Sequence, residues 1–394
     1  MRCLVLSAFL FVAPAFGQAP PNDAVRAKMQ AFVDSGELSG AVALSGRAAG
    51  VDALEVVGKR DIEGGKPMEA GTLFRIASMT KPITAIAIMM LAERGKLAVE
   101  DPVEQYLPEF KGQRLVASRD KDALTLKKPA RPIALKDLLT HTSGLPGGYP
   151  VGIADIYATR NRTLAECIAI QSQQPLDFEP GSKWSYCNTG IDTLGRIVEV
   201  VSKQSFPEFL KENLFAPLGM ANTTFYPTAD QLMQVATTYD RKDGKLVAVP
   251  KLFLDYAGGA KHPVPAGGLF SNASDLAKVY RMMLAKGMWD GKRILSEASI
   301  AAMTRVQTGD LKCGFTDEMA FGYGWAVVKK PTGITELLSA GSFGHGGAFG
   351  TQAWCDPVKD RFIVLLIQRT GLPNADASPI RRALQEAVFT PTPR

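Results

Sequence analysis

The sequence predicts an α/β protein of the α+β type, in which an antiparallel sheet from the N- and C-terminal parts of the chain is flanked by helices. A mainly helical region is inserted between these two parts. Three observations support this class. Strand-like segments occur near both ends, segments with helical spacing lie between them, and 46% of the 394 residues are hydrophobic against 21% charged. Such a composition is typical of a globular protein with a substantial core.

The N-terminal part begins with a predicted pair of strands. Residues 40–58 (GAVALSGRAAGVDALEVVG) contain two short apolar runs around a glycine-containing turn. Residues 79–95 (MTKPITAIAIMMLAERG) are apolar on most faces, which predicts a buried helix that ends at Gly95. Residues 96–180 are rich in proline, so we expect loops with short helices there.

The later elements follow from the same patterns. Residues 188–203 and 273–285 carry apolar residues at helical spacing. Strand character returns before a last helix near 378–388, in the segments 323–328, 351–357 and 361–368.

These elements predict one domain over residues 18–394. Its sheet part covers about 25–98 and 300–390, and its helical part covers about 99–299. We expect a functional cleft where the two parts meet.

The first residues predict export. The segment MRCLVLSAFLFVAPAFGQAP has one arginine, a short apolar run and then small residues, and Ala15-Phe16-Gly17 resembles a cleavage site. The apolar run is shorter than the roughly 20 residues of a membrane-spanning helix. We therefore expect a signal peptide over residues 1–17, a secreted or periplasmic protein, and no stable membrane insertion after cleavage. An uncleaved anchor is the alternative.

Charge and composition argue against several classes of partner. The net charge is +6, and the basic stretch between Lys111 and Arg131 lacks the aromatic residues and motifs of nucleic-acid binding, so we expect a solvated loop and no nucleic-acid partner. The sequence has no metal-ligand spacing and no phosphate-binding loop, so we expect no metal and no cofactor. Nothing in it indicates an oligomeric state.

Four cysteines remain after the expected cleavage. A domain of this size does not need a disulfide, although export would permit one. We therefore expect buried free thiols, with a disulfide as the alternative, at Cys167, Cys187, Cys313 and Cys355.

A candidate nucleophile lies in FRIASMTKP, residues 74–82. If a helix begins at Ser78, Pro82 is tolerated because the first turn leaves N–H groups unpaired anyway. Ser78 and Lys81 then share one face, and both burial and the positive helix N-terminus favour a neutral lysine that can take the serine proton. An N-cap serine followed by a solvated lysine is the alternative, and S-x-x-K alone permits it.

Three further segments accompany this one in the same chain. WSYCNTG provides Tyr186-x-Asn188, GHGGAFG provides His345-Gly346-Gly347, and LLTHTSGL covers 138–145. With Ser78-x-x-Lys81, and in this order, they resemble the serine β-lactamase and penicillin-binding-protein superfamily over roughly residues 25–390. The likeness is strongest to its class C-like branch, which includes DD-carboxypeptidases, D-aminopeptidases and carboxylesterases.

The resemblance implies a catalytic role for three residues. Ser78 would form an acyl-enzyme, and Lys81 would share the proton transfer. Tyr186 would act as general base, either as a phenolate or through a hydrogen bond to Lys81. A core tyrosine is the structural alternative for Tyr186.

The resemblance also implies a substrate-binding group. Asn188 would hydrogen-bond Lys81 and a substrate carbonyl, with a helix N-cap as its alternative. His345, Gly346 and Gly347 would border the substrate, although His345 could be purely structural. The backbone N–H of Ala348, on the strand that follows, would form an oxyanion hole with that of Ser78. His141 is expected to be structural.

The departures from the family pattern bear on the substrate. In the superfamily a K-T-G motif binds the substrate carboxylate, whereas here His345 and Gly346 replace its lysine and threonine, and a histidine is mostly neutral at pH 7. The sequence therefore favours a serine hydrolase that acts on small esters or amides and resembles a carboxylesterase.

Three alternatives differ from this hypothesis. A β-lactamase, D-alanyl-D-alanine carboxypeptidase or D-aminopeptidase would use the same residues on another substrate. A catalytically silent penicillin-binding-like module would bind a peptide or a partner protein without turnover. A Ser-His-Asp hydrolase of the α/β-hydrolase type is disfavoured, because the chain lacks the G-x-S-x-G elbow.

Overall fold

The computed structural model describes residues 21–390 apart from residues 154, 251, 253 and 257, so the expected signal peptide lies outside the described residues. Its main feature is an eight-stranded sheet in the order β12-β13-β14-β15-β16-β1-β2-β3, with every neighbouring pair antiparallel. The strands are β1 (Gly40–Arg47), β2 (Gly50–Asp61), β3 (Lys66–Pro67), β12 (Met319–Phe321), β13 (Ala326–Val328), β14 (Phe343–Gly346), β15 (Gln352–Asp356) and β16 (Arg361–Leu366).

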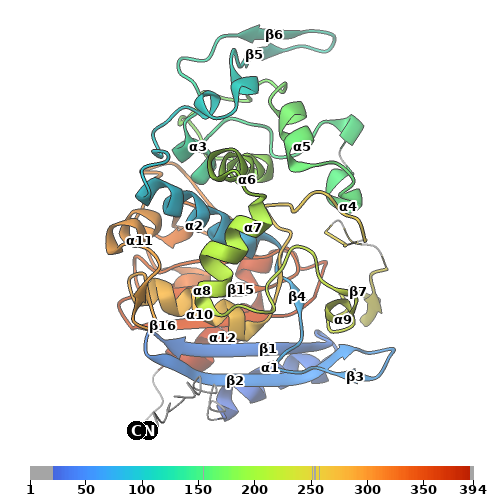
Figure 1. Cartoon of the computed structure of the whole chain (residues 1–394). Coiled ribbons are helices and arrows are strands. Elements are labelled where there is room, and N and C mark those ends of the chain that lie inside the picture. Colours follow the sequence, from blue (N-terminus) through green and yellow to red (C-terminus); the bar gives the residue numbers. More distant parts are fainter. Residues whose placement is uncertain (1–20, 154, 251, 253, 257, 391–394) are drawn as a thin grey trace, which may run out of the picture.

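The N- and C-terminal parts of the chain meet in the middle of this sheet. Strand β1 pairs with β16, and Val42 lies opposite Leu366 (Figure 1). The predicted fold class, an antiparallel sheet from both chain ends with a helical region inserted between them, is confirmed.

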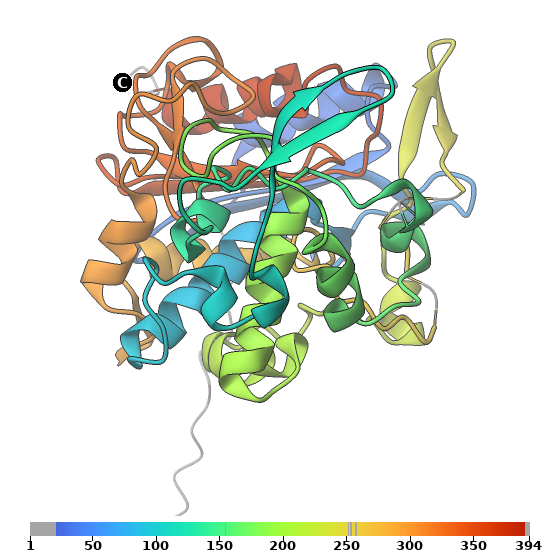
Figure 2. The same ribbon diagram turned by 90° about the horizontal axis from the view of Figure 1, so that it is seen from above.

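Both faces of the sheet are covered by helices. Side chains alternate along the strands, so Val42 and Val364 face one layer while Ala43 and Leu365 face the other. Helices α1 (Asp23–Asp34) and α12 (Pro379–Phe389) pack on the second face. Figure 2 shows these two helices on one side of the sheet and the helical region on the other.

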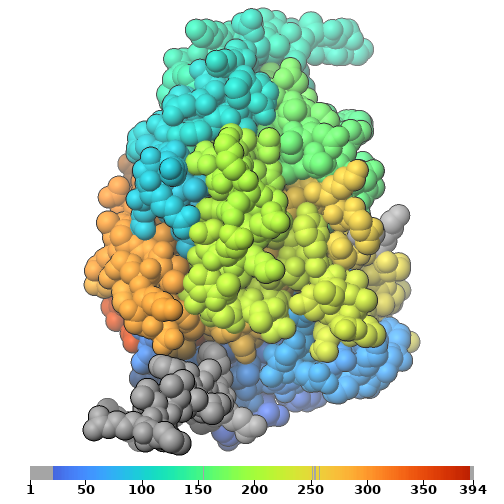
Figure 3. All heavy atoms as spheres, in the orientation of Figure 1, coloured from blue at the N-terminus to red at the C-terminus, as the bar shows by residue number. Residues whose placement is uncertain are grey.

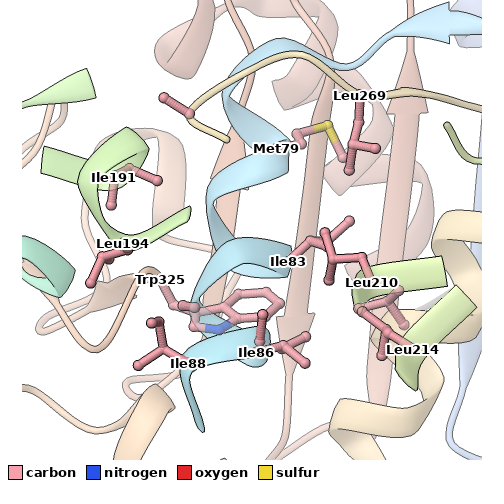
Figure 4. Packing of buried hydrophobic residues seen from close by; sticks show 14 of the residues in the cluster. Met79, Ile83, Ile86, Ile88, Ile191, Leu194, Leu210, Leu214, Leu269 and Trp325 are labelled. Carbon is pink, nitrogen blue, oxygen red and sulfur yellow. The ribbon is translucent and has the colours of Figure 1, made fainter. Parts of the chain in front are cut away.

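Helix α2 (Thr80–Glu93) runs through the centre of the molecule. All its residues from Thr80 to Leu91 are buried, because isoleucine, alanine and methionine occupy nearly every face. Figure 4 shows Ile83, Ile86 and Ile88 packed among Trp325 and leucines of the helical region. The start of α2 is therefore held by a large apolar contact area, which gives Ser78 and Lys81 a rigid support.

The inserted region contains nine further α-helices among the described residues. Two of them, α6 and α10, match the predicted helices at 188–203 and 273–285. The nine are α3 (Leu135–Leu139), α4 (Ile156–Thr159), α5 (Leu164–Gln171), α6 (Asn188–Ser202), α7 (Phe206–Leu210), α8 (Ala216–Leu218), α9 (Ala229–Leu232), α10 (Ala273–Leu284) and α11 (Glu297–Thr304).

The chain also contains short strands outside the main sheet that the sequence did not predict. Hairpin β5 (Leu115–Arg119) to β6 (Leu124–Lys127) lies in the basic stretch that was expected to be a loop, and it stands out from the body in Figure 3. Leu124 and Leu126 on it are exposed, so no buried face marked it as a strand pair in the sequence. The other short pairs are β7 (Tyr239–Lys242) with β8 (Lys245–Ala248), β4 (Phe74–Arg75) with β9 (Phe270–Ser271), and β10 (Met288–Trp289) with β11 (Lys292–Arg293).

The four cysteines among the described residues are free and buried, as the sequence predicted. Among the described residues, no helix is both long and apolar enough to cross a membrane.

Candidate active site

Ser78 and Lys81 lie side by side at the start of α2. Ser78 belongs to a short 3-10 turn (Ala77–Met79) and α2 begins at Thr80, so the helix starts two residues later than the sequence suggested. The Lys81 Nζ donates to Ser78 Oγ at 3.0 Å and to the carbonyl of Ala266 at 2.6 Å. Lys81 is fully buried, which contradicts the alternative of a solvated lysine.

Burial makes Lys81 a usable base near neutral pH. Loss of solvation has the largest effect on Lys81 and lowers its pKa to about 7. The nearby charge of Asp192 acts in the opposite direction and raises this pKa. A substantial fraction of Lys81 is therefore neutral at pH 7. In that form its nitrogen lone pair can accept the proton of the Ser78 hydroxyl 3.0 Å away.

Tyr186 completes this group from the opposite side. Its side chain is hydrogen-bonded to that of Ser78, and Lys81 Nζ lies 4.7 Å from the centroid of its ring. Burial raises the pKa of Tyr186 well above its usual value, so the hydroxyl keeps its proton. The phenolate suggested from the sequence is therefore disfavoured, because burial raises the pKa of Tyr186 more than the hydrogen bond with Ser78 lowers it.

His141 supports Tyr186 rather than the reaction itself. Its ring lies 4.5 Å from that of Tyr186, and its Nδ1 accepts the backbone N–H of Cys187 at 3.1 Å. Burial keeps the pKa of His141 well below its usual value, so the ring is neutral. This arrangement agrees with the structural role that the sequence analysis gave His141.

Asn188 does not make the contact that the resemblance implied. It is the first residue of α6 and is half-buried, but no hydrogen bond joins it to Lys81 in the described part of the chain. The carbonyl of Ala266 occupies that role instead. A backbone carbonyl is present in every residue, so no residue type in the sequence could have marked Ala266.

A buried carboxylate fixes Ala266. The Ala266 N–H donates to Asp192 Oδ1 at 2.8 Å, and the hydroxyls of Tyr157 and Tyr149 donate to Oδ2 at 2.6 and 3.2 Å. Burial raises the pKa of Asp192 to about 6, while these hydrogen bonds lower it. The sequence analysis missed Asp192, because a single aspartate in a helix usually faces solvent.

His345 lies at the end of β14, near the same group. Its Nδ1–H donates to the carbonyl of Gly346 at 2.7 Å, which leaves Nε2 with its lone pair. Burial, helped by the charge of Lys81, lowers the pKa of His345 to about 4, so it is neutral at pH 7 as expected. Its Nε2 is buried and has no partner among the described residues.

The turn after β14 docks against the segment that carries Ser78. A Cβ on Gly347 would lie 2.5 Å from the carbonyl oxygen of Ile76, and the Thr351 hydroxyl donates to that oxygen at 3.2 Å. Glycine is therefore required for this backbone approach. Ala348 lies in this turn and not on a strand, which corrects the sequence expectation. It is exposed, and its N–H has no acceptor in the described part of the chain, as an oxyanion donor requires.

Gly346 lies against two polar side chains. A Cβ at this position would lie 2.0 Å from Asp376 Oδ1 and 2.4 Å from Gln352 Nε2. The sequence analysis noted the missing side chain at position 346 but did not find Asp376, which is 30 residues away in the chain. No group of three or more His, Cys, Asp or Glu side chains among the described residues could hold a metal ion.

Comparisons with known proteins identify the family of this chain. The family model described as Beta-lactamase matches residues 25–387. The chain is 29% identical to esterase EstB of Burkholderia gladioli, over 89% of this chain and 91% of EstB. It is 30% identical to a putative D-alanyl-D-alanine carboxypeptidase of Escherichia coli K12, over 79% of this chain and 73% of that protein.

A solved structure provides the same likeness in three dimensions. The structure of EstCE1, described as a hydrolase with promiscuous acyltransferase activity, superposes with a TM-score of 0.77 at 25% identity. The match covers 93% of this chain and 98% of EstCE1.

Proposed function

The chain belongs to the Beta-lactamase family, and we propose that it is an exported serine hydrolase that cleaves small esters through an acyl-enzyme on Ser78. One observation carries this proposal: a fully buried lysine with a pKa lowered to about 7 lies 3.0 Å from the hydroxyl of Ser78. A buried lysine beside a serine hydroxyl is an arrangement that activates a nucleophile.

The first half of the reaction forms the acyl-enzyme. The Ser78 oxygen attacks the ester carbonyl as its proton passes to neutral Lys81, and the N–H groups of Ser78 and Ala348 stabilise the oxyanion. The Tyr186 hydroxyl then gives its proton to the departing alcohol, and Lys81 replaces that proton. The alcohol leaves with one proton, and Ser78 keeps the acyl group.

The second half reverses these roles with water. A water molecule attacks the acyl carbonyl and gives its proton through Tyr186 to Lys81, which is neutral again after the first half. The Ser78 oxygen departs, takes this proton back from Lys81, and the acid is released. Each cycle therefore consumes one water and returns Ser78 and Lys81 to their starting protonation states.

Two features favour esters over substrates that are bound through a carboxylate. His345 is neutral at pH 7, and position 346 has no hydroxyl to bind a carboxylate. The likeness to an esterase over most of both chains supports the same choice. Export is part of the proposal because of the signal-like segment at residues 1–17.

A peptidase acting on D-alanyl peptides is the second candidate. It is supported by the 30% identity to the putative carboxypeptidase of Escherichia coli. It would use Ser78, Lys81 and Tyr186 in the same roles, with an amine in place of the alcohol as leaving group.

Hydrolysis of p-nitrophenyl butyrate tests the proposal, with nitrocefin and a D-alanyl-D-alanine peptide run in parallel. Wild type should cleave the ester, and Ser78→Ala should lose at least about 10⁴-fold in kcat. Ser185→Ala is the matched control, because it removes a hydroxyl from a half-buried serine next to Tyr186. Undiminished turnover in Ser78→Ala contradicts the proposal. If the protein cleaves the peptide but not the ester, the peptidase alternative replaces the proposed esterase. If it cleaves nitrocefin but not the ester, the β-lactamase alternative does.

A further inference from the structure

A carboxylate occupies the place of the missing side chain at position 346. Asp376 lies in a short 3-10 turn (Ala375–Ala377) between β16 and α12, and its Oδ1 accepts from Gln352 Nε2 at 3.0 Å. The same oxygen lies 2.0 Å from where a Cβ of Gly346 would be. The next residue, Gly347, packs on the segment before Ser78, so this carboxylate borders the reaction site.

Asp376 makes no salt bridge among the described residues, although the buried guanidinium of Arg381 offsets part of its charge: burial lowers the pKa of Arg381, and the charge of Asp376 raises it. The Asp376 side chain is partly exposed. Burial has the largest effect on the pKa of Tyr186 and of His345, and the charge of Asp376 raises the pKa of both. The carboxylate therefore acts on the two groups that face the substrate.

One cation and one histidine share the small pocket that Asp376 lines. Arg381 is only 1% exposed, its guanidinium lies 4.1 Å from the centroid of the Trp354 ring, and its Nη1 donates to the Asp376 carbonyl at 2.6 Å. The guanidinium is therefore closed to a substrate, whereas the Asp376 side chain is partly exposed. His345 is neutral, and its Nε2 carries a lone pair, so it offers no proton to an anion.

Aromatic rings form another part of this pocket. Phe315 and Phe321 line it, and Phe315 is 50% exposed with its ring 5.0 Å from that of Tyr186. Asn374 Nδ2 donates to the Phe315 carbonyl at 2.9 Å, which ties this ring to the turn of Asp376. A carboxylate beside aromatic faces is a combination that attracts ammonium groups.

Tyr186 indicates which half of the substrate enters this pocket. In the proposed reaction Tyr186 protonates the departing alcohol, so the alcohol lies on the side of Tyr186, where Phe315 packs. Asp376 acts electrostatically on that same tyrosine. The pocket itself has room for only about 20 Å³, so the alcohol part of the ester would lie at its mouth, beside the exposed Phe315 ring.

We propose that Asp376 makes this site selective for esters whose alcohol part carries an ammonium group, and that it rejects esters whose alcohol part carries a carboxylate. This inference rests on the proposed ester hydrolysis and adds the substrate class. The selectivity acts on formation of the acyl-enzyme, because the alcohol has left before water attacks.

Three butyrate esters test this selectivity with one shared acyl-enzyme. They are butyrylcholine, 3,3-dimethylbutyl butyrate, which has the same shape without the charge, and 3-butyryloxypropanoate, which is an anion. In wild type we expect kcat/KM to fall in that order, by about tenfold at each step at low ionic strength. Added salt should compress the order, because a partly exposed charge is screened.

Asp376→Asn is the decisive variant, because asparagine keeps an oxygen that can accept the Gln352 hydrogen bond while removing the charge. We expect butyrylcholine to lose its advantage over the neutral ester. Asp317→Asn is the matched control, since it removes the same charge from an exposed position on the Phe315 loop outside this pocket. It should keep the order.

The outcomes separate this inference from the proposed function. Equal kcat/KM for the three esters, an order that persists in Asp376→Asn, or an order that is insensitive to salt in wild type overturns the role of Asp376. If the folded wild-type protein hydrolyses neither these esters nor p-nitrophenyl butyrate, the proposed function itself fails. Hydrolysis of p-nitrophenyl butyrate without any charge order leaves the function standing and removes only the selectivity.

Discussion

The site has two ends that are built in different ways. At the nucleophile end, Ser78 and Lys81 are three residues apart, and a single turn of backbone brings their side chains to 3.0 Å. At the strand end, Gly346 and Asp376 are 30 residues apart and meet only because β14 and the turn before α12 are packed together. The proposed nucleophile and base are thus brought together by local backbone structure, whereas the proposed substrate selectivity depends on the assembled fold.

Burial also has different consequences at the two ends. It brings the pKa of Lys81 to about 7, where the lysine can exchange protons during the reaction. It lowers the pKa of His345 to about 4, where the ring stays neutral and uncharged throughout. Burial therefore makes Lys81 able to act as a base and keeps His345 neutral, because the two side chains start from different pKa values.

At the nucleophile end, the largest effect of the variants compared below is expected on kcat. Lys81→Met keeps the length and the apolar stem of the side chain but removes the base, so kcat should fall by at least about 10³-fold at all pH values. Hydrolysis of p-nitrophenyl butyrate from pH 5 to 9 measures it. Lys183→Met, at an exposed lysine, should keep wild-type activity. A Lys81→Met enzyme with near wild-type kcat would show that Lys81 is only structural.

A smaller loss should follow from removing one oxygen at the same end. Tyr186→Phe keeps the ring contacts with His141 and Phe315 but removes the hydroxyl that is hydrogen-bonded to Ser78. We expect kcat/KM to fall by about 10²-fold, the usual contribution of a proton-transfer group. The thermal unfolding midpoint should change little. A large drop in that midpoint with unchanged kcat/KM would assign Tyr186 to the core instead.

At the strand end, the next largest effect is expected in the stability of the protein. A methyl group at position 346 would clash with Asp376 and Gln352, so Gly346→Ala should lower the free energy of unfolding by about 1–3 kcal/mol. Gly148→Ala is the control, because nothing lies within 4 Å of its added Cβ. Denaturant unfolding of both variants measures the difference. Equal stability of the two would mean that Asp376 does not press against position 346.

The smallest effect should appear in the pH profile. Since neutral Lys81 is the active form and its pKa is about 7, kcat/KM should rise with pH through that value. The charge of Asp192 raises the pKa of Lys81, so Asp192→Asn should move this rise to lower pH, by about one unit. Asp230→Asn, at an exposed aspartate, should leave it in place. A rise that moves to higher pH in Asp192→Asn contradicts the coupling.

Particular elements show how far the sequence predicted the fold. The β1–β2 pair, α6, α10 and α12 carry apolar patterns, α2 is a continuous apolar run, and the structure has all of them within a few residues of the expected bounds. The β5–β6 hairpin was missed, because its leucines are exposed and no core contact shapes its pattern. Strand β14 was also missed, because its glycines provide no side chains to reveal alternation.

By itself, the sequence determined the candidate reacting group and the two-part sheet. Residue spacing sets which side chains share a helix face, and apolar periodicity sets which segments are buried, and both are local properties of the chain. Only the tertiary structure decided the details that matter for turnover. Burial sets the pKa of Lys81, the Ala266 carbonyl replaces Asn188 as its partner, and Asp376 fills the space beside Gly346. Desolvation and contacts between distant residues arise only when the chain has folded. They therefore cannot be predicted from the spacing of residues in the sequence.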